Sequence, residues 1–112
     1  MRTLTAITHT SLDGVMQSAH DPEEDQSHGF TRGGWALPFV SDEGRRIVLG
    51  TISGEFDLLL GRRTYDLWSA AWGKQNDHPI GKAFNKATKY VVTHRPDSLN
   101  WKPSQPITGD VV

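Results

Sequence analysis

The sequence of 112 residues contains no cysteine. Disulfide bonds and thiolate chemistry are therefore excluded, and a reducing compartment such as the cytoplasm is the expected location. Long apolar runs are also missing. The amino-terminal residues 1–5 do not resemble a signal peptide, and no segment approaches the roughly 18 apolar residues that a membrane span needs. We expect a protein without a membrane partner.

Neither sign of charge dominates, because 12 basic side chains face 13 acidic ones and the net charge is −1. No broad basic face results, which argues against a nucleic-acid partner. The five histidines form no HxxxH or HxH pair, so we expect no metal site. Neither a GxSxG motif nor a Walker-type glycine run is present, so a serine hydrolase and an ATPase have no local support.

What the sequence does contain is an alternation of strand and helix patterns. Strands are predicted at residues 4–10, 56–60 and 89–93, with a possible further strand at the very end, where Ile107 and Thr108 lead into Gly109-Asp110-Val111-Val112. Helices are predicted from Ser41 to Gly54, after Gly61, and from Pro79. Alternating elements predict an α/β fold with a mainly parallel central sheet and flanking helices, in one domain.

Three segments carry more specific expectations. The nearly continuous apolar run Phe56–Leu60 is typical of a strand covered on both faces. Tyr65, Trp68 and Trp72 follow helical spacing, which indicates core packing. The polar stretch Ser18–Gly34 is long for a loop inside a compact domain, and either a functional lid or disorder explains it.

Turns fall at the carboxyl ends of the three predicted strands, at Ser11–Gly14, Gly61–Thr64 and Thr93–Arg95. Ligands of open α/β sheets bind beyond the carboxyl ends of the strands. The position of these turns therefore indicates a ligand site.

The turn Gly61–Thr64 is suited to phosphate. Gly61 allows a tight turn and close approach of a ligand, and the free N–H groups of the following helix attract an anion. Arg62 or Arg63 adds a fork of donors, and the Thr64 hydroxyl adds another. The alternative is a capped helix with two solvated arginines.

A second anion could bind at the next turn, where Thr93 and His94 are followed by Arg95. A hydroxyl and a guanidinium at this place could hold the 2′-phosphate that distinguishes NADP from NAD. Taken with the turn Gly61–Thr64, this pattern favours a dinucleotide stretched across the strand ends.

The first turn offers one carboxylate, Asp13, which could orient a polar substrate or assist proton delivery. Asp13 could equally shape the turn by bonding its own backbone. Met16 and Gln17 either face a planar ring or simply begin the polar loop.

Several motifs occur in a fixed order: Ser11-Leu12-Asp13-Gly14-Val15-Met16, Gly33-Gly34-Trp35, Leu58-Leu59-Leu60-Gly61-Arg62-Arg63-Thr64-Tyr65, Tyr90-Val91-Val92-Thr93 and Gly109-Asp110-Val111-Val112. In this combination the chain resembles the dihydrofolate-reductase-like family typified by the reductase domain of the bacterial riboflavin-biosynthesis deaminase/reductase. The resemblance is greatest to the small stand-alone members and runs over nearly the whole chain. Members continue beyond the last motif, so residues 1–112 are expected to be the N-terminal portion of a single domain.

The resemblance implies NADPH as cofactor and an activity similar to that of 5-amino-6-(5-phosphoribosylamino)uracil reductase. It implies that residues 61–64 hold the NADPH phosphates and that residues 93–95 lie near the adenosine end. Ser11 and Gly14 would border the nicotinamide, and Met16 and Trp35 the small-molecule substrate. Homodimers are common in the family, and the open sheet edge of a shortened domain also favours pairing of two copies.

Two other functions remain open on the sequence alone. The same motifs suit a nucleotide-binding module without turnover, or a truncated remnant of an enzyme. The helix rich in tryptophan could instead serve a structural interaction domain, which would bind no nucleotide.

Overall fold

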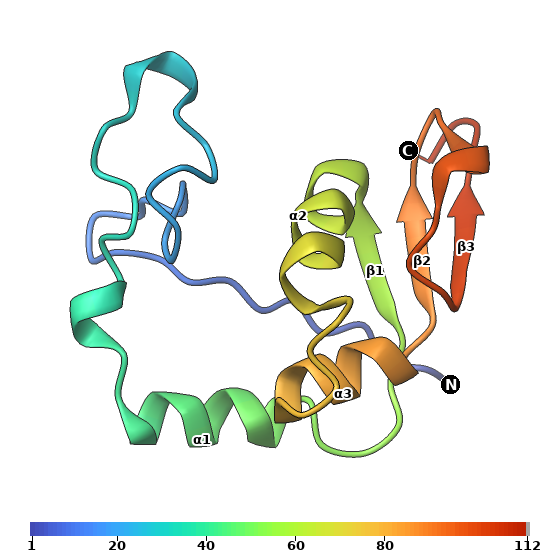
Figure 1. Ribbon diagram of the computed structural model, residues 1–112, viewed down its shortest axis with the longest axis horizontal. Helices are drawn as coiled ribbons and strands as arrows, with labels where there is room; N and C mark the ends of the chain where they lie inside the picture. Colours follow the sequence, from blue (N-terminus) through green and yellow to red (C-terminus); the bar gives the residue numbers. More distant parts are fainter. Residues whose placement is uncertain (112) are drawn as a thin grey trace. The chain divides into compact units, whose positions relative to one another are not determined.

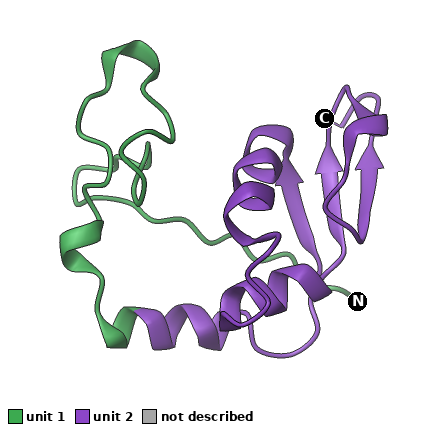
Figure 2. Ribbon diagram, viewed as in Figure 1, with its two compact units in different colours: residues 1–44 green, residues 45–112 purple. Residues whose placement is uncertain are grey.

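The computed structural model describes residues 1–111. The chain forms two compact units, one of residues 1–44 and one that begins at residue 45 (Figure 2). The expectation of a single domain stays a prediction. Among the described residues, no helix is long and apolar enough to cross a lipid bilayer.

The second unit is built on a parallel sheet of three strands, β1 (Leu58–Gly61), β2 (Lys89–Val92) and β3 (Ser104–Ile107), in that spatial order (Figure 1). Both pairs of neighbours, β1 with β2 and β2 with β3, are parallel. The prediction of an α/β fold with a mainly parallel sheet is therefore confirmed.

The connection from β1 to β2 contains α2 (Arg62–Trp72) and α3 (Pro79–Lys86). Pro79 takes the first helical turn, where its missing N–H costs nothing. The ring nitrogen of His78 caps α3 by accepting a hydrogen bond from the N–H of Ile80 at 3.2 Å. Both helices and both strands begin close to where the sequence predicts them.

The core of this unit is formed by six buried side chains: Leu60, Tyr65, Phe84, Val91, Leu99 and Trp101. The ring of Trp68 stacks on that of Phe84, with 4.8 Å between centroids. The Tyr65 hydroxyl accepts a hydrogen bond of 2.6 Å from the N–H of Trp101. The interpretation of the aromatic stripe of α2 as core packing is confirmed.

Within residues 1–111, side chains pack against only one face of β1. Leu60 points into the core and is 7% exposed, whereas its neighbour Leu59 is 55% exposed. The expectation that Phe56–Leu60 is covered on both faces was wrong. Side chains alternate along a strand, so an apolar run also arises where one face of a sheet is open.

The helix α1 (Asp42–Thr51) begins and ends much as predicted. The hydroxyl of Ser41 accepts a hydrogen bond of 3.1 Å from the N–H of Gly44 and so caps the first turn. Gly54 adopts a φ of 93°, which favours glycine, just beyond the helix. The boundary between the two units lies in this first turn.

Two strand predictions were wrong. Residues 4–10 form no strand, and all of them are exposed. High β propensity therefore did not suffice, because a strand also needs a partner that its own sequence does not specify. Residues 109–111 of the predicted last strand are not a strand, and Val112 lies outside the described residues. The last strand is instead β3, whose Pro106 is tolerated at the edge of a sheet.

The first unit contains the polar loop and two short 3-10 helices, Ser27–Gly29 and Leu37–Phe39. The loop is closed at its base, where the N–H of Gly34 donates to the carbonyl of Ser18 at 2.7 Å. Such a closed surface loop is typical of an Ω-loop. These hydrogen bonds hold the loop in one conformation in this structure, and its use as a lid stays a prediction.

Candidate functional site

The carboxyl ends of β1 and β2 lie side by side, because Gly61 is opposite Val92 in the parallel register. The turns that follow them therefore meet. A nitrogen of the Arg62 guanidinium donates to the Thr93 hydroxyl at 3.3 Å. Two of the three turns expected at strand ends, Gly61–Thr64 and Thr93–Arg95, therefore lie together, whereas the third, Ser11–Gly14, follows residues 4–10, which form no strand.

Arg62 is fixed by the protein itself. Its guanidinium also donates to the carbonyl oxygens of Arg95 at 2.9 Å and Ser98 at 3.4 Å. Its Nε donates to the Asp66 carboxylate at 2.8 Å, and its side chain is 16% exposed. In this arrangement Arg62 positions the loop that carries Arg95, and its expected contact with a phosphate stays a prediction.

Thr93 is also engaged in the protein. It is 4% exposed, and its hydroxyl oxygen accepts hydrogen bonds from Arg62 and from the N–H of Arg95 at 3.0 Å. His94 and Arg95, in contrast, are exposed. The second turn therefore presents the side chains of His94 and Arg95, rather than the Thr93 hydroxyl, to solvent.

An open depression of about 540 Å³ lies between these elements. We call it the strand-end groove, and its lining residues are Arg62, Arg63, Asp66, Leu67, Ala70 and Arg95. Arg63, Leu67 and Ala70 are spaced by four and three residues along α2, so they share one face of the helix. The groove thus combines an apolar strip with cations at one end.

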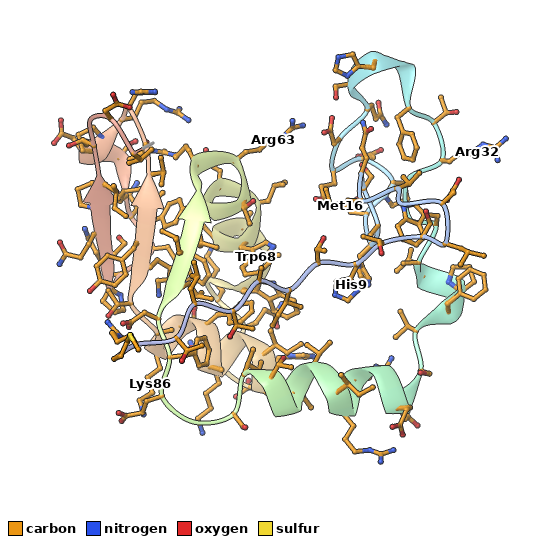
Figure 3. The ribbon with its side chains drawn as sticks, turned by 180° about the vertical axis from the view of Figure 1, so that it is seen from behind. His9, Met16, Arg32, Arg63, Trp68 and Lys86 are labelled. Atoms are coloured by element: carbon orange, nitrogen blue, oxygen red, sulfur yellow. The ribbon has the colours of Figure 1, made fainter. Side chains whose placement is uncertain are left out.

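The start of α2 contributes to the same end of the groove. Its N-cap residue, Gly61, has no side chain that could cap the first turn. Backbone N–H groups at such a helix start are available to an anion. Arg63 lies at this end of the unit, where β1 ends, and points away from the ribbon (Figure 3).

The expected reason for Gly61 was partly wrong. Its φ of −71° and ψ of 156° are open to most residues, so the turn does not require glycine. A Cβ added there would meet no atom within 4 Å. Space for the approach of a ligand is therefore present, although a tight glycine turn is not.

Three members of the groove, Asp66, Leu67 and Ala70, were missed, and Asp66 is the charged one. Asp66 accepts hydrogen bonds from Arg62 at 2.8 Å and from Arg95 at 3.3 Å, and so joins the two guanidinium groups. Arg62 and Asp66 are four residues apart on one helix, a spacing that pairs opposite charges. That spacing could have indicated the ion pair, whereas the contact with Arg95 depends on the fold.

The first unit holds the other predicted site residues. The Ser11 hydroxyl donates to the Asp13 carboxylate and accepts a hydrogen bond of 2.9 Å from the N–H of Val15. The hydrogen bond from Ser11 lowers the pKa of Asp13, which therefore carries its charge at neutral pH. Gly14 closes the turn with a φ of 86°. This geometry favours the role of Asp13 in shaping the turn.

The residues expected beside the substrate are placed in the same unit. Trp35 is half-buried, and its indole N–H donates to the carbonyl of Gln17 at 3.0 Å. The sulfur of Met16 accepts a hydrogen bond from the Thr8 hydroxyl at 3.2 Å, and Met16 is 60% exposed. Gln17 binds the backbone of the polar loop. The expected roles of these side chains toward a ligand stay predictions.

No protein-family model matches the chain, and no curated protein matches it either. In residues 1–111, no three histidine or carboxylate side chains are grouped as metal ligands would be.

Proposed function

We propose that the chain binds NADPH at the strand-end groove and acts as an NADPH-dependent reductase on a small heterocyclic or pyrimidine-type substrate. The observation that carries the proposal is the meeting of the turns Gly61–Thr64 and Thr93–Arg95 beside a groove with three arginines. Ligands of parallel sheets bind at such adjacent carboxyl ends, and guanidinium groups suit phosphate.

Each part of the groove has a role in this proposal. The guanidinium groups of Arg63 and Arg95 would bind phosphate oxygens, while Arg62 holds the loop of Arg95 in place. Leu67 and Ala70 would contact an apolar part of the nucleotide. When bound, NADPH would supply the hydride that reduces a carbon–nitrogen or carbonyl double bond of the substrate.

Further parts of the proposal come from the resemblance alone. They are the nicotinamide contacts of Ser11 and Gly14, the substrate contacts of Met16 and Trp35, the involvement of Asp13, and the homodimer. The lowered pKa of Asp13 suits a charged group that orients a substrate better than a group that donates a proton at neutral pH.

Isothermal titration calorimetry of the full chain with NADPH tests the binding. We expect micromolar affinity, weaker at high salt, and a loss of about tenfold in Arg95→Ala because a charge-assisted bond to phosphate is removed. Lys86→Ala is the matched control, since Lys86 is exposed and lies at the opposite end of the unit from Arg63 (Figure 3). No binding of NADPH at micromolar concentrations would overturn the proposal.

A nucleotide-binding module without turnover is the second candidate. One observation favours this candidate. The polar side chains that line the groove are three arginines and one aspartate, and this aspartate is already paired with two of the arginines. Kinetics separate the two functions. Oxidation of NADPH with a pyrimidine ribitylamine or a dihydrofolate-like substrate supports the reductase, whereas binding without oxidation of NADPH supports the module.

A further inference from the structure

Asp66 lies in the strand-end groove between two cations, and its two carboxylate oxygens bind different arginines. One oxygen is 2.8 Å from Nε of Arg62, and the other is 3.3 Å from a terminal nitrogen of Arg95. The side chains of Asp66 and Arg95 are 47% and 66% exposed, whereas that of Arg62 is 16% exposed. A carboxylate therefore occupies the position at Arg95 that an incoming anion would take.

We propose that Asp66 is an internal competitor for the anion: its carboxylate occupies Arg95 in the free protein, and a phosphate group of the ligand displaces it. The inference deepens the proposed function, on which it rests. The ligand class is a nucleotide or another molecule with an exposed phosphate.

The two ion pairs of Asp66 differ in how easily they break. The pair with Arg95 consists of one long contact between two exposed side chains, and such pairs add little to stability. The pair with Arg62 is shorter and belongs to a guanidinium held by three further hydrogen bonds. An anion should therefore take Arg95 from Asp66 while Asp66 stays on Arg62.

The exchange favours a phosphate for a geometric reason. A phosphate offers two oxygens to one guanidinium fork, and bidentate charge-assisted bonds are stronger than a single long contact. Asp66 gives Arg95 one oxygen only, since its other oxygen is bound to Arg62. Until a ligand arrives, the same contact also holds Arg95 at the edge of the groove.

Calorimetry with adenosine 2′,5′-bisphosphate tests the competition in the full chain. Asp66→Asn should bind this probe about fivefold more tightly than the wild type, because the competing charge is gone. Asp97→Asn is the control, since it removes the same charge from the exposed 3-10 helix Pro96–Ser98 next to Arg95. It should change the affinity by less than about twofold.

A double-mutant cycle with Arg95→Ala separates competition from a general effect of charge. If Asp66 competes for Arg95, then Asp66→Asn does not raise the affinity for the bisphosphate when Arg95 is already replaced by alanine. A gain of the same size in that background would overturn the proposal. So would an unchanged affinity in Asp66→Asn, or an absence of probe binding in both proteins.

The outcomes also separate this inference from the proposed function. NADPH binding that is unaffected by Asp66→Asn would leave the reductase standing and refute the competition. Tighter binding of the bisphosphate in Asp66→Asn, without binding or oxidation of NADPH in any variant, would support the competition and refute the reductase.

Discussion

The two units of the chain are held together by different forces. In residues 45–111 six large apolar side chains are buried in one cluster. In residues 1–44 the buried residues are Ser18, Ala19 and Gly34, while Leu12, Phe39 and other large apolar side chains are exposed. The first unit depends on hydrogen bonds, and these stabilise less than apolar burial because water competes for them. We therefore expect the second unit to carry most of the free energy of unfolding.

The largest expected effect comes from the core. Phe84→Ala removes a ring that is 6% exposed and stacked on Trp68, and it leaves a cavity. The free energy of unfolding should fall by about 3–5 kcal/mol, measured by urea denaturation. Phe39→Ala is the matched control in the first unit, where Phe39 is 80% exposed, and it should change stability by less than about 0.5 kcal/mol. Equal losses would break the comparison between the units.

The same contrast explains which elements could be predicted from the sequence. The helices α1, α2 and α3 carry their signals locally, as a capping Ser41, an aromatic stripe and an initial Pro79. The strand β1 is apolar and directly precedes α2, and β2 contains the apolar run Tyr90–Val92. For these elements the local preference and the burial of side chains agree.

Prediction failed where a partner elsewhere in the chain decides the structure. Residues 4–10 have β propensity but form no strand, whereas β3 forms despite Pro106 because β2 pairs with it. At the groove, the meeting of two turns followed from parallel topology. The hydrogen bond between Arg62 and Thr93 could not be predicted from that topology, because it depends on the geometry of two side chains that are 31 residues apart in sequence.

A buried ionisable residue of the second unit, Lys89, provides a second test of how its core stabilises the fold. Lys89 is 0% exposed, and its Nζ donates to the carbonyl oxygens of Phe84 at 2.9 Å, Asn85 at 3.3 Å and Lys102 at 3.4 Å. The same atom lies 4.5 Å from the centre of the Trp101 ring. Burial lowers the pKa of Lys89 from 10.5 to about 8. These polar contacts oppose that effect, since they favour the charged form.

The lowered pKa has a definite consequence for stability. Between about pH 8 and pH 10.5 the folded state binds fewer protons at Lys89 than the unfolded state does. The free energy of unfolding should therefore rise with pH across this interval, by up to about 3 kcal/mol. Urea denaturation at several pH values measures the rise.

Two variants isolate the effect of Lys89. Lys89→Met should abolish the rise of stability between pH 8 and 10.5, whereas Lys86→Met, at an exposed position, should preserve it. A wild-type stability that is flat over this interval would contradict the prediction. It would mean that the three carbonyl groups hold the proton of Lys89 as firmly as water does.

The smallest effect on overall stability is expected in the polar loop. A Cβ at Gly33 would lie 2.6 Å from the backbone of Pro22, so Gly33→Ala must push the segment around Gly33 away from the segment around Pro22. The nearby bonds from Gly34 to Ser18 and from Ala36 to Ala19 should open, and the amides of Gly34 and Ala36 should exchange hydrogen faster.

The free energy of unfolding, in contrast, should change by less than about 1 kcal/mol in Gly33→Ala, because the loop buries little apolar surface. Gly50→Ala is the matched control, since a Cβ there meets no atom within 4 Å and alanine favours the helix α1. It should leave amide exchange in the loop unchanged. A loss of stability in Gly33→Ala as large as that in Phe84→Ala would show that the polar loop supports the fold as a whole. Residues 1–44 would then contribute as much to the free energy of unfolding as the second unit does.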